Sequence, residues 1–246
     1  MLSKAQNKYI RSLTQQKFRK EYSVFIAEGE KIASEWLNSA AHIKMIVATE
    51  YWINVNNSLI SKHSEATVHT VSESELQAIS NLQTPNNVLL VVAAPKTEEL
   101  PIMEEWCIAL DNIQDPGNMG SIIRIADWFG IKYVIASANC VDFYNPKVVQ
   151  AAMGGHLRVH LYETDLEQFI ANSKAPILAA TLDGENIMNI KKLKTAILLI
   201  GNESKGISPD LLKEKVRKIT IPGKGGAESL NAAVSAGILC AMLMSS

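Results

Sequence analysis

The feature that most constrains the fold is the C-terminal part, where the glycine-rich segment 221–228 leads into the apolar segment 229–243. The polar residues of the apolar segment are Ser229, Asn231 and Ser235, all near its start. A helix that is apolar on all sides must be buried, and glycine lets a ligand approach the main chain because it has no Cβ atom. The sequence therefore predicts a ligand-binding loop held against a buried helix.

Strand-like and helix-like patterns alternate along the chain, which is typical of an α/β fold. In the second half, apolar runs of strand length lie at about 106–111, 132–136, 157–161, 177–181, 196–200 and 217–221. Strands followed by helices favour a parallel sheet, in which ligands bind at the carboxyl ends of the strands. We therefore expect the functional loops to follow strands.

A polar stretch bracketed by Pro95 and Pro101 predicts a linker between two domains. With the linker at 96–103, the first domain covers residues 1–95 and the second covers residues 104–246. A chain of 246 residues is long enough for two ordinary domains.

The first 20 residues carry no acidic side chain and six basic ones: Lys4, Lys8, Arg11, Lys17, Arg19 and Lys20. We expect Ser3 to cap a helix that extends to about Arg19. Phosphate contacts supply most of the sequence-independent affinity for RNA, so this concentrated charge favours RNA binding. The alternative is a solvated basic helix at a terminus, which needs no ligand. The net charge of −1 for the whole chain supports neither.

Bulk composition excludes several classes of protein. Apolar residues make up 47% and charged residues 20%, as in globular proteins. No apolar run reaches the roughly 18 residues of a membrane span, and the N-terminus lacks the apolar core of a signal peptide. Cys107, Cys140 and Cys240 lack the spacing of metal ligands, and the histidines do not cluster. We therefore expect a cytoplasmic protein without a metal and without a membrane partner.

Two further segments combine a strand with a polar loop, at residues 110–127 and 198–208. The glycines of the first do not form G-x-G-x-x-G, and in the second Ile207 stands where a P-loop has lysine. These absences disfavour a nucleotide-dependent α/β enzyme. Together with segment 221–239, the two segments resemble in order and spacing the three motifs of the SpoU (TrmH-like) RNA 2′-O-methyltransferases, a branch of the SPOUT superfamily.

This resemblance covers about residues 104–246 and implies a fold and a function. The second domain is expected to have a trefoil-knotted α/β fold with a parallel sheet, and residues 1–95 a small α/β substrate-binding domain similar to ribosomal proteins. The implied reaction is 2′-O-methylation of a structured RNA by S-adenosylmethionine, with 23S-type ribosomal RNA favoured over tRNA. The family also implies a homodimer that completes the active site across its interface. A tRNA methyltransferase and a non-catalytic RNA-binding or assembly protein remain alternatives.

The resemblance implies four residues that hold the methyl donor: Thr181, Gly201, Ile221 and Leu230. Main-chain N–H and C=O groups of these loops would bind the edge of the adenine ring. For Ile221 and Leu230 the alternative is packing in the core. A main-chain contact leaves the side chain free to pack, so both interpretations can hold together.

Arg124 is the residue that the resemblance places at the reaction centre. The family mechanism often makes this arginine the base, but a guanidinium group stays protonated in proteins. We therefore favour binding of the neighbouring phosphate and electrostatic stabilisation of the developing alkoxide. The alternative is a surface pair with Asp127 at i,i+3, worth a few tenths of a kcal/mol.

Four more residues complete the predicted catalytic set: Asn118, Glu203, Ser229 and Asn231. Asn118 either bonds the substrate or caps the helix that follows it. Glu203 either positions Arg124 or the ribose, or is a solvated loop carboxylate. Ser229 and Asn231 open the last helix, where either can be the N-cap, and the resemblance also points them into the site.

Overall fold

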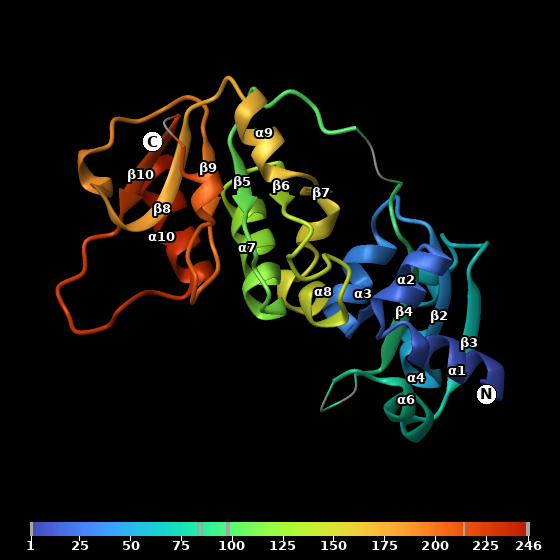
Figure 1. The fold of residues 1–246 in the computed structure, drawn as a ribbon. Coiled ribbons are helices and arrows are strands. Elements are labelled where there is room, and N and C mark those ends of the chain that lie inside the picture. The colour runs from blue at the N-terminus through green and yellow to red at the C-terminus, as the bar shows by residue number, and fades with distance from the viewer. Residues whose placement is uncertain (1, 83, 85, 97–98, 214, 245–246) are drawn as a thin grey trace. The chain divides into compact units, whose positions relative to one another are not determined.

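The computed structural model describes residues 2–82, 84, 86–96, 99–213 and 215–244. It divides into two compact units (Figure 1). The first combines Met1–Lys96 with Asp142–Leu157, and the second combines Thr97–Val141 with Arg158–Ser246. The chain therefore passes between the units three times. The predicted linker at 96–103, whose residues 97–98 lie outside the described part, covers one of these passages.

The first unit is built on a mixed four-stranded sheet with the order β1-β4-β2-β3. Its strands are β1 (Val24–Glu28), β2 (Ile43–Thr49), β3 (Thr67–Val71) and β4 (Val88–Ala93). Strand β4 is antiparallel to β1 and β2, whereas β2 and β3 are parallel. Phe25 and Ile26, neighbours on β1, belong to different apolar clusters because successive side chains of a strand point to opposite faces. Apolar packing therefore covers both faces of the sheet.

The helices of the first unit are α1 (Lys4–Ser12), α2 (Gln16–Tyr22), α3 (Glu30–Leu37), α4 (Glu50–Val55), α5 (Asn57–Ile60), α6 (Glu73–Ile79), α8 (Pro146–Ala152) and the 3-10 turn η1 (Gly155–Leu157). The basic N-terminal segment thus forms two helices, and the expectation of one helix to Arg19 is wrong. Ser3 caps α1 as predicted, since its hydroxyl accepts a hydrogen bond from the Gln6 amide at 3.2 Å. The break comes at Leu13, which is fully buried and whose carbonyl accepts from the Arg19 guanidinium at 2.7 Å.

Segment 142–157 belongs to the second half of the sequence but packs within the first unit. Asp142 accepts two hydrogen bonds from the guanidinium of Arg19, at 2.9 and 2.5 Å. The ring of Tyr144 lies 4.8 Å from that of Phe25, measured between centroids, and Val149 belongs to the same apolar cluster as Phe25. The core of the first unit is therefore completed by residues from far along the chain.

The second unit is built on a parallel six-stranded sheet with the order β10-β8-β9-β5-β6-β7. Its strands are β5 (Cys107–Leu110), β6 (Tyr133–Ala136), β7 (His160–Glu163), β8 (Ile177–Asn186), β9 (Ile197–Ile200) and β10 (Val216–Thr220). Its helices are α7 (Pro116–Trp128), α9 (Leu166–Asn172) and α10 (Ala232–Met244), with the 3-10 turns η2 (Ile187–Asn189) and η3 (Pro209–Leu211). The predicted α/β class with a parallel sheet is confirmed. The strand expected at 157–161 begins instead at His160, because the preceding residues form η1.

The strand order places a topological switch at β5, the first strand of this sheet. Strands β6 and β7 follow toward one edge, whereas β8, β9 and β10 lie on the other side of β5. In open α/β sheets, ligands bind outside the carboxyl ends of the strands at such a switch. The loops after β5 and β9 therefore lie where a ligand site is expected. The trefoil knot implied by the resemblance stays a prediction.

Helix α10 has a buried face and a partly exposed face. Ala236 and Leu239 are almost completely buried, whereas Val234 is 49% exposed. The expectation of a helix buried on all sides is therefore wrong for a single chain. The helix packs against α7 and η2, and these contacts leave apolar side chains such as Val234 accessible.

Candidate active site

The three motif loops meet in a hydrogen-bond network centred on Asn118, a buried residue in the first turn of α7. The side-chain nitrogen of Asn118 donates to the carboxylate of Glu203, which follows β9. The side-chain oxygen of Asn118 accepts from Nδ2 of Asn231, which precedes α10, at 2.7 Å. One side chain thus joins residues that are 85 and 113 positions away in the sequence.

Helix caps orient two members of this network. Asp115 is the N-cap of α7, and its carboxylate accepts from the main-chain amide of Asn118 at 2.7 Å. Asn118 is therefore not the cap, and its side chain is free for the network. Asn231 caps α10, because its Oδ1 accepts from two amides of the first turn at 2.9 and 3.2 Å. Ser229, the other predicted cap, is exposed and lies outside the network.

The loop after β9 is a tight turn that presents Glu203. Asn202 and Gly206 exchange main-chain hydrogen bonds at 3.0 and 2.9 Å. A Cβ atom on Gly201 would lie 2.4 Å from the carbonyl carbon of Gly206. Glycine at position 201 is therefore required by the turn itself, whether or not a ligand is bound.

Three residues predicted to hold the methyl donor lie on, or directly after, three neighbouring strands. Ala179 of β8 pairs with Leu199 of β9, and two residues further on come Thr181 and Gly201. Ile221 directly follows β10, which neighbours β8 on its other side. Thr181 lies within β8, which continues to Asn186, whereas Gly201 and Ile221 directly follow β9 and β10. The register therefore makes Thr181 and Gly201 neighbours.

The hydroxyl of Thr181 is buried beside the carboxylate of Asp183. Its Oγ1 makes no hydrogen bond of acceptable geometry within the described part of the chain. The pKa of Asp183 is lowered by the Lys218 ammonium first and by the Thr181 hydroxyl second, so a carboxylate is near this hydroxyl. Buried hydroxyl groups normally have a partner, and a ligand at the strand edge would supply one. Leu230, the fourth predicted residue, is 45% exposed in the segment before α10.

Arg124 is exposed on α7 and does not join the Asn118 network. It lies six positions after Asn118, which places it roughly 9 Å further along the helix axis and about 120° around it. Asp127, its alternative partner, pairs with Arg158 at 2.8 Å, so the Arg124–Asp127 pair is wrong. Arg124 shares its face of the helix with Trp128, which is 84% exposed. One chain therefore leaves this arginine without the partners that a reaction centre requires.

Comparison with known proteins assigns the family. Residues 105–241 match the SpoU rRNA Methylase family, and residues 4–90 match the MRM3-like substrate binding domain. The chain belongs to the SpoU rRNA methylase family. The first match includes the loops of all three motifs.

Relatives of the SpoU family resemble this chain over nearly its whole length. The 23S rRNA (guanosine(2553)-2′-O)-methyltransferase RlmP of Bacillus subtilis is 28% identical over 235 residues, which cover 93% of this chain and 92% of the relative. A Porphyromonas gingivalis structure assigned to the TrmH family of RNA methyltransferases has a TM-score of 0.86 and 35% identity, covering 99% of this chain and 98% of that one. The AdoMet-bound rRNA methyltransferase of Sinorhizobium meliloti has a TM-score of 0.85 and 29% identity, covering 99% and 95%.

Asp111, a carboxylate with 3% exposure directly after β5, was not among the residues predicted from the sequence. Its Oδ2 accepts from the main-chain amide of Ser208 at 2.7 Å, and its Oδ1 accepts from the side chain of Asn112 at 2.8 Å. The available signal was an aspartate directly after a buried strand, at the sheet edge where functional loops were expected. No motif marked this residue as functional.

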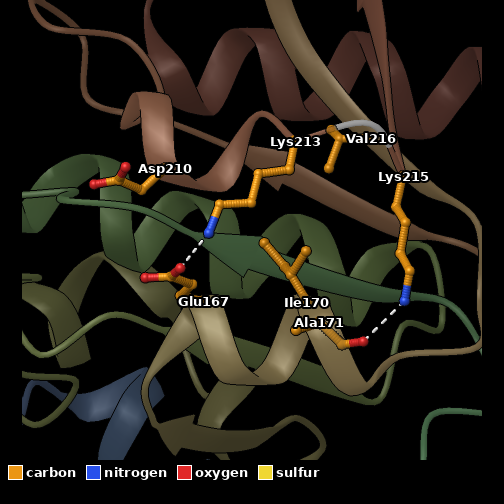
Figure 2. A pocket seen from close by; sticks show the side chains of 7 residues that line it. All are labelled: Glu167, Ile170, Ala171, Asp210, Lys213, Lys215 and Val216. Carbon is orange, nitrogen blue, oxygen red and sulfur yellow. Dashed lines mark hydrogen bonds and ion pairs between the residues drawn. The ribbon is translucent and has the colours of Figure 1, made fainter.

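Two hollows open beside the sheet of this SpoU domain. One has a volume of about 540 Å³ and is lined by five carboxylates: Asp111, Glu163, Asp165, Glu167 and Asp210. The other, of about 450 Å³, is shown in Figure 2, where Lys213 pairs with Glu167 and Lys215 donates to the carbonyl of Ala171 at 3.0 Å. Neither is lined by the four residues predicted to hold the methyl donor. The larger hollow instead borders the loops after β5 and β9, through Asp111, Asn112 and Ser208.

Within the described part of the chain, no group of three or more His, Cys, Asp or Glu side chains is arranged to bind a metal ion. The helices of that part are all too short or too polar to cross a bilayer. The three cysteines are free thiols.

Proposed function

We propose that this protein transfers a methyl group from S-adenosylmethionine to the 2′-oxygen of a ribose in ribosomal RNA. The observation that carries the proposal is the Asn118 network, which joins the three SpoU motif loops through Glu203 and Asn231. These loops lie where an open parallel sheet places its ligand. The names of the Bacillus subtilis and Sinorhizobium meliloti relatives support ribosomal RNA as the substrate class.

S-adenosylmethionine supplies a methyl group bound to a positively charged sulfur. Thr181, Gly201, Ile221 and Leu230 would hold it, Thr181 through its hydroxyl and the others through main-chain groups. The buried hydroxyl of Thr181 and the neighbouring positions of Thr181 and Gly201 on β8 and after β9 fit such a ligand. The AdoMet-bound state of the Sinorhizobium meliloti structure supports the same donor.

We assign Arg124 to the RNA phosphate and to the developing oxyanion. Transfer would form a bond between the 2′-oxygen and the methyl carbon and break the bond from that carbon to the donor sulfur, which keeps the electron pair, while the 2′-oxygen loses its proton. A guanidinium group stays protonated, so Arg124 stabilises negative charge, and the proton leaves to phosphate or water. Asn118 holds Glu203, whose carboxylate is then placed to bind the ribose or the guanidinium of Arg124.

The proposal includes a homodimer that completes the site. Trp128 on α7 and Val234 on α10 are exposed apolar residues on two helices that pack together, and Met188 on η2, which contacts α10, is 69% exposed. Exposed apolar patches of this kind often mark subunit interfaces. Arg124 shares its helix face with Trp128 and would therefore lie in this interface. In the proposed dimer, Arg124 of the second copy approaches the Asn118 network of the first.

Mixing two inactive variants tests the activity and the composite site together. Arg124→Ala should lower methyl transfer by about 100-fold, as for other electrostatic groups at a developing oxyanion. Glu203→Gln removes the charge that binds the ribose or Arg124, and the resulting misplacement should also cost about 100-fold. After subunit exchange, a composite site should recover roughly a quarter of wild-type activity, because half of the dimers are mixed and each holds one intact site. No recovery would contradict a site built from two chains. Lys132→Ala, which removes an exposed cation paired with Glu105, is the control and should leave activity unchanged.

The substrate is tested by mapping 2′-O-methyl groups in ribosomal RNA and tRNA from cells with and without the protein. Loss of a ribosomal methyl group supports the proposal, and loss of a tRNA methyl group supports the tRNA alternative. Unchanged RNA, together with no uptake of S-adenosylmethionine in calorimetry, supports a non-catalytic RNA-binding protein. We place the protein in the cytoplasm, where free thiols such as Cys107 and Cys240 stay reduced.

A further inference from the structure

We propose that Asp111 is a positioning residue that holds Glu203 in place for methyl transfer, an inference that rests on the proposed function. Asp111 directly follows β5, in the centre of the sheet, and is almost fully buried. It contacts neither Glu203 nor Asn118 in the hydrogen bonds that the structure records for the described residues. Its influence runs through the loop after β9.

The first contact fixes the far end of that loop. The main-chain amide of Ser208 donates to Oδ2 of Asp111 at 2.7 Å. A buried carboxylate is costly unless hydrogen bonds satisfy it, so this contact and the one to Asn112 at 2.8 Å are strongly favoured. The loop after β9 is thereby tied to the loop after β5.

The second contact fixes the start of the loop. Asn112 has a left-handed backbone with φ of 57°, and its own amide donates to the hydroxyl of Ser137 at 3.1 Å. This conformation turns the carbonyl of Asn112 to accept from Nδ2 of Asn202 at 2.9 Å. Asp111 therefore acts on Asn202 by holding the side chain of Asn112.

The third contact carries the effect to Glu203. Oδ1 of Asn202 accepts from the main-chain amides of Ser204 and Lys205, at 2.9 and 3.0 Å. These amides immediately follow Glu203, so the turn is clamped on both sides of the carboxylate. Glu203 then meets Asn118 with little freedom left in its backbone. The carboxylate of Asp111 is thus three hydrogen bonds away from the group it orients.

Asparagine at position 111 should loosen this arrangement while keeping its shape. Asp111 accepts hydrogen bonds on both oxygens, whereas asparagine would point an NH₂ group at one of the two donors. One bond is then lost and a buried donor is left unpaired, which is costly. We expect hydrogen exchange of the Ser204 and Lys205 amides to accelerate roughly 10- to 100-fold. Since misplacement of about 1 Å can cost 100-fold in rate, kcat should fall and KM for RNA should change little.

A double-mutant cycle separates positioning from general structural support. If Asp111 acts through Glu203, Asp111→Asn should lower kcat in the wild type and have almost no further effect in Glu203→Gln. The matched control is Glu28→Gln, which replaces a carboxylate buried to 4% exposure in the first unit that also accepts from a main-chain amide. It should leave exchange in the loop after β9 unchanged. Asn202→Ala removes the last contact of the path and serves if Asp111→Asn does not fold.

Unchanged exchange at Ser204 and Lys205 in a folded Asp111→Asn variant would overturn the inference, whatever the result for Asn202→Ala. Additive losses of kcat in the double variant would also overturn it, because Asp111 would then act independently of Glu203. Faster exchange in a protein that transfers no methyl group to any RNA would refute the proposed function, while the control of the Glu203 turn by Asp111 would stand. The exchange measurement therefore decides the contact even where the activity assay fails.

Discussion

Replacing Asp142 with asparagine should destabilise the first unit much more than the loss of an exposed ion pair would. Arg19 is 4% exposed and Asp142 is 15% exposed, and their nearest nitrogen and oxygen lie 2.5 Å apart. The variant leaves the guanidinium of Arg19 buried, with the carbonyl of Leu13 as its remaining strong acceptor. Removal of one partner from a buried pair costs about 3–5 kcal/mol. Because Asp142 keeps some contact with water, we expect a loss of about 3 kcal/mol in the free energy of unfolding.

The loss can be measured by urea unfolding and by thermal unfolding followed by circular dichroism. For a chain of this size, about 3 kcal/mol corresponds to a drop in Tm of roughly 6–12 °C. The matched control is Glu185→Gln, which breaks the Arg217–Glu185 pair at 2.6 Å. Those side chains are 47% and 41% exposed, so solvent screens the pair and its loss should cost less than about 1 kcal/mol.

In Asp142→Asn, amide hydrogen exchange should become faster in the first unit. Equal, small effects of the two variants would refute the reasoning, since they would mean that the Arg19–Asp142 pair is as solvated as the exposed one. A loss of protection confined to the second unit would refute it as well, because segment 142–157 would then not contribute to the core of the first.

Three further predictions follow from individual residues. Burial lowers the pKa of His156 to about 4 from its usual 6.5, so its contribution to stability is complete above pH 6.5 and is lost as the pH falls toward 4. His156→Gln should therefore reduce the change in the free energy of unfolding between pH 6.5 and pH 4. An unchanged pH dependence would exclude His156 as the source of that loss. Neutralising Lys4, Lys8 and Arg11 should weaken RNA binding similarly across sequences and reduce its salt dependence, whereas an unaltered slope would identify a solvated helix. Gly201→Ala should lower Tm without any ligand, because its Cβ would meet the main chain of Gly206; an unchanged Tm would show that the turn opens at little cost.

Local chemistry made much of this fold predictable from the sequence. Apolar runs located the strands, and the capping position of Ser3 was read directly from its neighbours. The residues of the Asn118 network were named through the motif resemblance, but their hydrogen bonds to one another could not be derived, because these residues are about a hundred positions apart. Arg19 looked like one more basic surface residue, since nothing nearby in sequence reveals a partner 123 positions away. Long-range pairing of this kind leaves no periodic signal.

The same limit applies to Asp111. The role that we propose for Asp111 depends on its hydrogen bond from the amide of Ser208, which is 97 positions away in the sequence. Arg124 shows the opposite case. The motif predicted that Arg124 lies at the reaction centre, whereas in the single chain its side chain is exposed. In our proposal, a second copy of the chain supplies the residues that surround it.

The three passages of the chain between its units have a consequence for how such proteins can be recombined. Suppose that residues 1–96 are replaced by those of a relative while segment 142–157 is kept. Tyr144 and Val149 would then pack against residues of another protein in place of the core around Phe25. A shortened chain that begins at Thr97 would expose the same apolar side chains to water. A working chimera would need three matched junctions, so residues 1–96 should be exchanged together with segment 142–157, which completes their core.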